Sequence, residues 1–292
     1  MKKSLSYHLV SFVLKLKGIK KMFSTDPVDY KKIRKEDVKI PKSSFFKKQK
    51  RFTVLDTTVT EVLSKEGTNK LILFIHGGAF ISGPAEHHWN TIRKLHKHTV
   101  YTIWLCDYPK APESQIDVIS NNIDAVYKKA LESYQPENIV LLGDSVGGTL
   151  SFALVQRLIK NQKEIPSKII AISPVMDATL SNPRIMEFDK KDPMLSKKGI
   201  LSAKKMCANN KDLTDLKISP IYGSFNGFPK TLLFLGENDI MYPDQEILVE
   251  KLKESSITFR AIVGKQMPHI WVLLPFLKEG KIALKELLKE LN

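Results

Sequence analysis

The feature of this chain that most restricts its fold is the hexapeptide Gly-Asp-Ser-Val-Gly-Gly at residues 143–148. It follows an apolar run at residues 139–142 and opens a segment whose apolar positions recur at helical spacing. An apolar run bounded by glycine is typical of a buried strand, so the pattern predicts a sharp strand-to-helix turn with Ser145 at its apex. Gly143 and Gly147 have the G-x-S-x-G spacing, in which a side chain at either glycine would collide with neighbouring backbone while the serine hydroxyl is exposed at the top of the sheet.

A second glycine-containing turn lies upstream, where the apolar run at residues 71–75 leads directly into His-Gly-Gly-Ala-Phe at residues 76–80. Bare backbone after a strand can present N–H groups to a negatively charged oxygen. This turn and the residue after Ser145 therefore predict an oxyanion hole formed by Gly77, Gly78, Ala79 and Val146. We expect the N–H groups of Gly78, Ala79 and Val146 to hold the oxyanion, and Gly77 to let the loop turn.

An acidic residue and a histidine follow the last two predicted strands. Asp239 comes after the apolar run at residues 231–235, and His269 comes after the run at residues 258–263. The chain order serine, acid, histidine is that of the α/β-hydrolase triad and differs from the orders in chymotrypsin and subtilisin. We therefore predict Ser145 as the nucleophile, His269 as its general base and Asp239 as the group that orients the imidazole.

The acid of this triad has two rivals in the sequence. Glu237 lies two residues before Asp239, and Asp244 lies at the predicted start of a helix, where a carboxylate has a structural reason to occur. His269 has no such rival, because it is the only histidine after the last predicted strand.

These motifs together resemble the hormone-sensitive-lipase-like carboxylesterases, also called the α/β-hydrolase fold-3 group. The resemblance covers roughly residues 70–270 and is carried by residues 76–80, 107–113 (Asp-Tyr-Pro-Lys-Ala-Pro-Glu), 143–148, 173–174 (Ser-Pro) and 236–239 (Gly-Glu-Asn-Asp). It implies that Asp239 is the triad acid and that the ring of His76 braces the oxyanion loop. The chain departs from the family pattern at Ala79, where a third glycine is usual, and at Val146, where alanine is usual.

The alternation of predicted strands and helices from residue 70 onward indicates a mainly parallel sheet with helices on both faces, an α/β fold. The 292 residues are enough for one such domain with a cap. We expect an N-terminal cap segment at residues 1–50, then an α/β-hydrolase catalytic domain at residues 51–292. The alternation lapses at residues 177–227, which we interpret as a cap insertion or a structural excursion.

The net charge of +15 is concentrated near the N-terminus. Residues 1–51 contain 16 Lys and Arg against 4 Asp and Glu, a net charge of +12. The segment has no nucleic-acid-binding motif and no aromatic pattern for base stacking, so we expect no nucleic-acid partner.

A helix is predicted at residues 4–19, with apolar residues on one stripe. The stripe consists of Leu5, Leu9, Phe12, Val13, Leu16 and Ile19. Lysines interrupt the segment far short of the roughly 20 apolar residues that a membrane span needs. Two roles stay open: a helix that caps the pocket, and a helix that lies on an anionic membrane surface.

Other polar residues have structural interpretations. His87 and His88 are adjacent and would point in different directions on a helix, so we predict no metal site and no cofactor. Asp107, Glu113 and Asp144 are expected to hold loops together through hydrogen bonds and ion pairs. The two cysteines have no disulfide or metal spacing, which favours a reducing, cytoplasmic location, either free or peripheral at the membrane.

The function predicted from these features is that of a serine carboxylesterase acting on small-molecule esters with short to medium acyl chains. The alternatives are an arylformamidase-like amide hydrolase and a membrane-associated lipase. A non-catalytic small-molecule receptor on the same fold would lack the catalytic histidine, whereas His269 is present. Pairing of edge strands into a homodimer is common among similar esterases, and we include it as an expectation.

Overall fold

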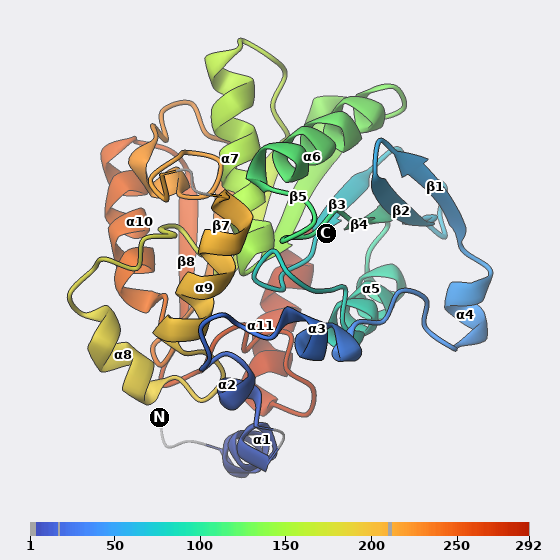
Figure 1. Cartoon of the computed structure of the whole chain (residues 1–292). Coiled ribbons are helices and arrows are strands. Elements are labelled where there is room, and N and C mark those ends of the chain that lie inside the picture. The colour runs from blue at the N-terminus through green and yellow to red at the C-terminus, as the bar shows by residue number, and fades with distance from the viewer. Residues whose placement is uncertain (1–3, 17, 210–211, 292) are drawn as a thin grey trace.

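The computed structural model describes residues 4–16, 18–209 and 212–291. Within them, eight strands form one sheet in the order β1-β2-β4-β3-β5-β6-β7-β8, and helices lie on both sides of it (Figure 1). The first two strands pair antiparallel, β2 pairs antiparallel with β4, and the remaining pairings are parallel. The predicted mainly parallel α/β sheet is therefore confirmed. The strands are β1 (Lys50–Val54), β2 (Thr57–Val62), β3 (Leu71–Ile75), β4 (Thr102–Asp107), β5 (Ile139–Asp144), β6 (Lys168–Ile172), β7 (Lys230–Gly236) and β8 (Phe259–Gly264).

The helices of the described residues fall into three groups, namely the N-terminal segment, the layers beside the sheet and the segment after β6. The N-terminal group is α1 (Leu5–Leu16), α2 (Ile19–Met22), α3 (Tyr30–Ile33), η1 (Arg34–Glu36) and α4 (Ser44–Lys47). The layers contain α5 (Glu86–His98), α6 (Ile116–Leu131), η2 (Pro136–Asn138), α7 (Val146–Lys160), α10 (Tyr242–Glu254) and α11 (Lys278–Lys289). The segment after β6 contains α8 (Ile185–Lys191), α9 (Lys197–Ala208) and η3 (Pro220–Tyr222).

The central strands are recognisable in the sequence because the sheet is covered on both faces. Every residue of β3 and of β5 is buried. A parallel strand buried on both faces is apolar at successive positions rather than at alternate ones. This explains why continuous apolar runs located these strands to within two residues.

Some predicted boundaries differ from the structure. The apolar spacing at residues 275–291 predicts a helix over that range, but α11 begins only at Lys278, because Phe276 has a φ of 65° and cannot continue a right-handed helix. The spacing at residues 116–134 likewise predicts one helix, but α6 ends at Leu131, shortly before the turn that contains Pro136. Residues 24–50, which show no periodicity, contain α3, η1 and α4, each too short to produce a visible repeat.

The N-terminal segment packs against the helices after β6. The backbone N–H of Val28 donates to Ser202 Oγ of α9 at 2.9 Å. Lys20 Nζ donates to the carbonyl oxygens of Asp189 and Asp192, the latter at 2.9 Å, and lies 3.4 Å from Asp189 Oδ1. Two segments about 170 residues apart in the sequence therefore form one layer.

Helix α1 packs against α11, and its inward-facing side chains are Tyr7, Val10 and Leu14. The predicted helix at residues 4–19 ends at Leu16, and Ile19 of the predicted stripe begins α2 and packs against the core. The stripe residues within α1 are exposed, so of the two open roles they do not have that of covering a pocket: Leu5, Leu9, Phe12, Val13 and Leu16. None of the helices in the described ranges has the length and hydropathy needed to cross a bilayer.

Candidate active site

Ser145 lies in a strained turn between β5 and α7, as predicted. Its φ of 52° and ψ of −121° are rare for a residue with a side chain. The turn is held by a 2.8 Å hydrogen bond from Ser145 N to the Ile172 carbonyl. A Cβ at Gly147 would lie 1.9 Å from the Ile75 carbonyl oxygen of the neighbouring strand. Only glycine therefore allows α7 to start this close to β3.

His269 and Asp239 form a buried pair. His269 Nδ1 lies 2.8 Å from Asp239 Oδ2, and both residues are almost inaccessible to solvent. The Met241 N–H donates to Asp239 Oδ1 at 2.9 Å, and Gln245 Nε2 donates to Oδ2 at 3.2 Å. Because the carboxylate can only accept, the proton must be on Nδ1 of His269. The other ring nitrogen, Nε2, is then free to act as a base.

The two alternative acids, Glu237 and Asp244, contact other residues in the structure. Glu237 Oε2 accepts the Gln266 N–H at 2.8 Å, and Asp244 Oδ1 accepts from Asn182 Nδ2 at 3.0 Å. Asp244 lies in the first turn of α10 rather than at its N-cap, which is Met241. Of the three acidic residues, Asp239 is the one that contacts His269.

The charge on Asp239 also controls the protonation of His269. Burial by itself lowers the pKa of His269, but the adjacent Asp239 carboxylate outweighs burial and the pKa is raised above its ordinary value. The Asp239 carboxylate therefore stabilises the protonated form of His269.

The oxyanion loop has an open backbone. Gly78, Ala79 and Phe80 all have positive φ values. In the described part of the chain, the hydrogen bonds leave the N–H groups of Gly78, Ala79 and Val146 without an acceptor. The Gly77 N–H instead donates to Asp144 Oδ1 at 3.0 Å, so Gly77 is not a free donor.

The ring of His76 packs against this loop and supports it, as the family resemblance implies. Its ring is fully buried and stacks on Tyr108 at a centroid distance of 4.5 Å. Nδ1 lies 2.6 Å from the Gly77 carbonyl, and Tyr108 Oη donates to the His76 carbonyl at 2.8 Å. Burial lowers the pKa of His76 to about 4, so the ring is neutral and acts as a structural element.

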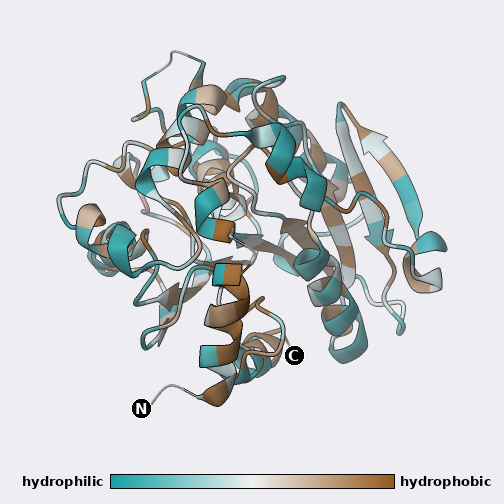
Figure 2. Cartoon of the chain, turned by 60° about the horizontal axis from the view of Figure 1, so that its bottom comes forward, coloured by the Kyte–Doolittle hydropathy of each residue, from teal (hydrophilic) through white to brown (hydrophobic). Residues whose placement is uncertain are grey.

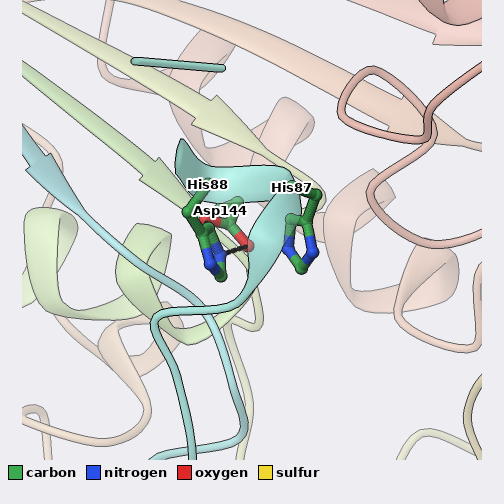
Figure 3. Close-up of side chains that lie close together, drawn as sticks. All are labelled: His87, His88 and Asp144. Carbon is green, nitrogen blue, oxygen red and sulfur yellow. Dashed lines mark hydrogen bonds and ion pairs between the residues drawn. The ribbon is translucent and has the colours of Figure 1, made fainter. Parts of the chain in front are cut away.

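His87, His88 and Asp144 form a cluster beside Ser145, and their potential ligand atoms lie within 4.8 Å of one another (Figure 3). The two imidazole centroids are only 3.9 Å apart, closer than adjacent helical positions led us to expect. His88 Nδ1 accepts the Ala85 N–H at 2.8 Å, so Nε2 carries the proton and faces Asp144 Oδ1 at 3.2 Å. A metal ion at this cluster would have to break both contacts, so the donor set fits a structural network better than a metal site.

Two residues of the basic N-terminal segment hold the oxyanion loop, and the sequence analysis did not identify them. The Arg34 guanidinium donates to the carbonyls of Ile81 and Ala111 and makes a two-point contact with Glu113 at 2.7 and 2.9 Å. Asp37 Oδ1 accepts the Gly83 N–H at 2.7 Å. Nothing in the local pattern distinguishes Arg34 from the lysines around it.

Asp192 connects the segment after β6 to the loop that carries the acid. Its carboxylate accepts the N–H groups of Met194 and Leu195 on one side and of Ile240 on the other, at 2.7 to 3.0 Å. The side chain is buried beside Asp239. Burial and the Asp239 charge raise the pKa of Asp192 to about 6.

Lys204 is a fully buried lysine on α9. Its ammonium nitrogen lies 4.3 Å from the centroid of the Phe80 ring, at the end of the oxyanion loop. Among the described residues it has no hydrogen-bond partner. Burial lowers the pKa of Lys204 to about 7.

A strained serine turn, a buried acid–histidine pair and a glycine loop at one edge of a parallel sheet define the class of α/β hydrolases. A family model described as α/β hydrolase fold matches residues 72–273. An esterase from Acinetobacter venetianus is 30% identical over 235 residues, covering 78% of this chain and 76% of the relative. Esterase LipU from Mycobacterium tuberculosis is 29% identical, covering 71% of this chain and 72% of the relative. The chain belongs to this α/β-hydrolase family, in agreement with its resemblance to the hormone-sensitive-lipase-like carboxylesterases, and is a carboxylic ester hydrolase.

Solved structures agree on the fold. The crystal structure of an esterase from the bacterial hormone-sensitive lipase family superposes with a TM-score of 0.88 at 22% identity, covering 100% of this chain and 98% of the other. An esterase/lipase from an uncultured bacterium gives 0.86 at 24% identity, with 99% of both chains covered.

Proposed function

We propose that this protein is a serine carboxylesterase that hydrolyses esters with short to medium acyl chains through an acyl-enzyme intermediate. The observation that carries the proposal is the 2.8 Å contact between His269 Nδ1 and Asp239 Oδ2 in a fold that also holds Ser145 in a strained turn. A serine hydroxyl needs a base, and that base needs a group that fixes its tautomer.

In the proposed mechanism, Ser145 Oγ attacks the ester carbonyl while His269 Nε2 takes its proton. The resulting oxyanion accepts hydrogen bonds from the N–H groups of Gly78, Ala79 and Val146, each worth about 3 kcal/mol in a preorganised hole. His269 then donates the proton to the leaving alcohol. A water activated by the same imidazole hydrolyses the acyl-enzyme. Asp239 stabilises the imidazolium in both half-reactions.

Two observations support a preference for short to medium acyl chains. Ser145 and His269 are 8% and 3% exposed, so the reacting groups are enclosed. We propose that the part of the N-terminal segment after α1, residues 18–50, forms the cap that encloses them together with α8 and α9, through the contacts of Arg34, Asp192 and Lys204 described above. An acetyl-hydrolase from Streptomyces hygroscopicus, 23% identical and covering 80% of this chain, is among the relatives.

The test is hydrolysis of p-nitrophenyl esters from acetate to laurate by the wild type, Ser145→Ala and Ser133→Ala. Ser133 is an exposed serine just after α6 and serves as the matched control. We expect activity that declines with chain length, is lost by more than about 10⁴-fold in Ser145→Ala and is unchanged in Ser133→Ala. A fluorophosphonate adduct detected by mass spectrometry should form on the wild type and on Ser133→Ala only.

Rates that rise steadily toward laurate would contradict the proposed chain-length preference. Residual activity in Ser145→Ala equal to that of the wild type would contradict the proposed nucleophile.

A further inference from the structure

The outward side of α1 is an apolar surface, which we call the outer α1 face. It consists of Leu5, Leu9, Phe12, Val13 and Leu16, each between 40% and 89% exposed. Figure 2 shows α1 as a largely hydrophobic helix at the edge of the molecule, close to the N-terminus. Contiguous exposed apolar surface of this kind marks an interaction site, whereas scattered exposed apolar residues do not.

The orientation of this face is fixed by contacts on the other side of the helix. Ser4 donates through its N–H and its hydroxyl to the Glu279 carboxylate, at 3.2 and 2.9 Å. The Lys278 N–H donates to Ser6 Oγ at 3.0 Å, and Tyr7 is buried. Because α1 is docked on α11 through these groups, the outer α1 face cannot rotate inward without breaking them.

Two exposed apolar side chains lie close in sequence to the contact between α1 and α11. Phe276, just before α11, is 74% exposed, and Ile282 on α11 is 56% exposed. Both lie within three residues of Glu279, which contacts Ser4. Two elements from opposite ends of the chain therefore contribute apolar side chains to the same region.

The charges around this surface are predominantly positive. α1 contains no acidic residue and carries Lys15 near its end, and Lys278 and Lys281 are exposed on α11. The carboxylate of Glu279, an acidic residue on α11, accepts a hydrogen bond from the Ser4 hydroxyl. An apolar stripe flanked by lysines is the arrangement that binds at the interface of an anionic membrane, with the helix lying in the plane of the surface.

From this geometry we propose that the outer α1 face docks the protein on the surface of an anionic lipid bilayer. Leu5, Leu9, Phe12 and Leu16 enter the boundary between headgroups and acyl chains, while Lys15 and the lysines of α11 meet the lipid phosphates. A second copy of the chain is the competing occupant. The positive charge of the whole segment opposes self-association and favours the anionic surface.

The experiment is co-sedimentation of the full-length protein with vesicles of phosphatidylcholine alone or of phosphatidylcholine mixed with the anionic lipid phosphatidylglycerol. The test variant is Leu9→Glu/Phe12→Glu. The matched control is Leu55→Glu/Leu63→Glu, which places the same charges at two leucines of similar exposure, 62% and 60%, in the β1–β2 region. Light scattering without vesicles reports the oligomeric state of each protein.

We expect the wild type and the control to bind phosphatidylglycerol vesicles, with binding reduced by salt, and the test variant to bind at least about tenfold less. Hydrolysis of soluble p-nitrophenyl acetate should be equal in all three proteins, which shows that the variants are folded and separates this proposal from the proposed function. Equal vesicle binding by the test variant and the wild type would overturn the proposal. So would a wild-type dimer that becomes monomeric in the test variant without any vesicle binding.

Discussion

Asp239 and His269 show how much of the chemistry depends on contacts at single atoms. Glu237, Asp239 and Asp244 are the same kind of residue within eight positions, yet Asp239 alone among them reaches the imidazole. Three donors surround its two oxygens and keep the carboxylate pointed at Nδ1. The role of an acid in this loop is therefore decided by the direction of its side chain and not by its residue type.

The first prediction concerns the pH dependence of this pair. Because the Asp239 charge raises the pKa of His269, activity should be lost as pH falls through that raised pKa. Asp239→Asn removes the charge, so we expect the acid limb of the kcat/KM profile to move to lower pH and kcat to fall by about 10⁴-fold. Glu237→Gln, which keeps an acceptor for Gln266, is the control and should leave both unchanged. An acid limb that stays in place in Asp239→Asn would contradict the assignment.

At the scale of elements, the site is assembled by polar side chains that connect segments distant in sequence. Asp192 joins the segment before α9 to the loop before α10, Arg34 joins η1 to the oxyanion loop, and Lys204 places α9 over the ring of Phe80. Each is buried or half-buried, so its removal leaves backbone groups or packing without a partner.

The second prediction concerns Asp192. Its pKa is raised to about 6 in the folded protein against an ordinary value of 3.8, so the folded state binds more protons between about pH 4 and 6. The contribution of Asp192 to stability should therefore fall as pH rises through this window. Asp192→Asn removes this slope but leaves one N–H unpaired, so we expect it to lower the free energy of unfolding by about 1–3 kcal/mol at pH 4, where the wild-type side chain is protonated, and by less at pH 7.

Urea unfolding at several pH values measures this effect. Asp56→Asn, at an exposed aspartate in the turn between β1 and β2, is the control and should change the free energy of unfolding by less than about 0.5 kcal/mol. An Asp192→Asn protein as stable as the wild type at pH 4 would show that the Asp192 side chain does not link the two segments.

The third prediction concerns Lys204. Its pKa is lowered to about 7 from 10.5, so the unfolded state binds more protons than the folded state between these values. The free-energy cost of burying the Lys204 ammonium is therefore fully present below pH 7 and disappears as the pH rises toward 10.5. Lys204→Met replaces the stem with an apolar chain of similar length, and it should raise the thermal midpoint at pH 6 and much less at pH 10. A midpoint increase independent of pH would argue against a buried charge at this position.

At the scale of the whole molecule, charge and apolar surface are distributed unevenly. The sheet and its helices form the catalytic body, while the basic N-terminal segment serves two different regions. Residues 20–37 contact α8, α9 and the oxyanion loop, whereas α1 contacts α11 and exposes its apolar face. The two parts of the N-terminal segment therefore contact different regions of the protein, although they are adjacent in sequence.

The fourth prediction tests this division by truncation. Deleting residues 1–16 removes α1 and one buried aromatic side chain, Tyr7, so we expect a loss of about 2–3 kcal/mol in stability and retention of most activity on p-nitrophenyl acetate. Deleting residues 1–37 also removes Arg34 and Asp37 and should abolish activity, because the oxyanion loop loses its supports. Equal activity of the two truncated proteins, measured at matched folded concentration, would contradict this division.

The order of strands and helices, the turn at Ser145, the histidine after the last strand and the glycine loop could all be predicted from the sequence. They depend on local patterns: a strand buried on both faces is a continuous apolar run, and a turn that brings α7 against Ile75 requires Gly147. The chain order of Ser145, Asp239 and His269 added the topology, because the carboxyl ends of parallel strands meet at one edge of the sheet.

The tertiary structure decided which acid reaches the imidazole, which acceptor the Gly77 N–H binds, and which face of α1 is covered. Gly77 donates to Asp144, and Tyr7, Val10 and Leu14 rather than the more obvious stripe turn inward. The roles of Arg34, Asp192 and Lys204 likewise depend on contacts with segments far away in the sequence. Helical and strand periodicity follows from neighbouring residues, whereas the partner of a polar group and the burial of a helix face depend on segments brought together from far along the chain, which no local pattern encodes.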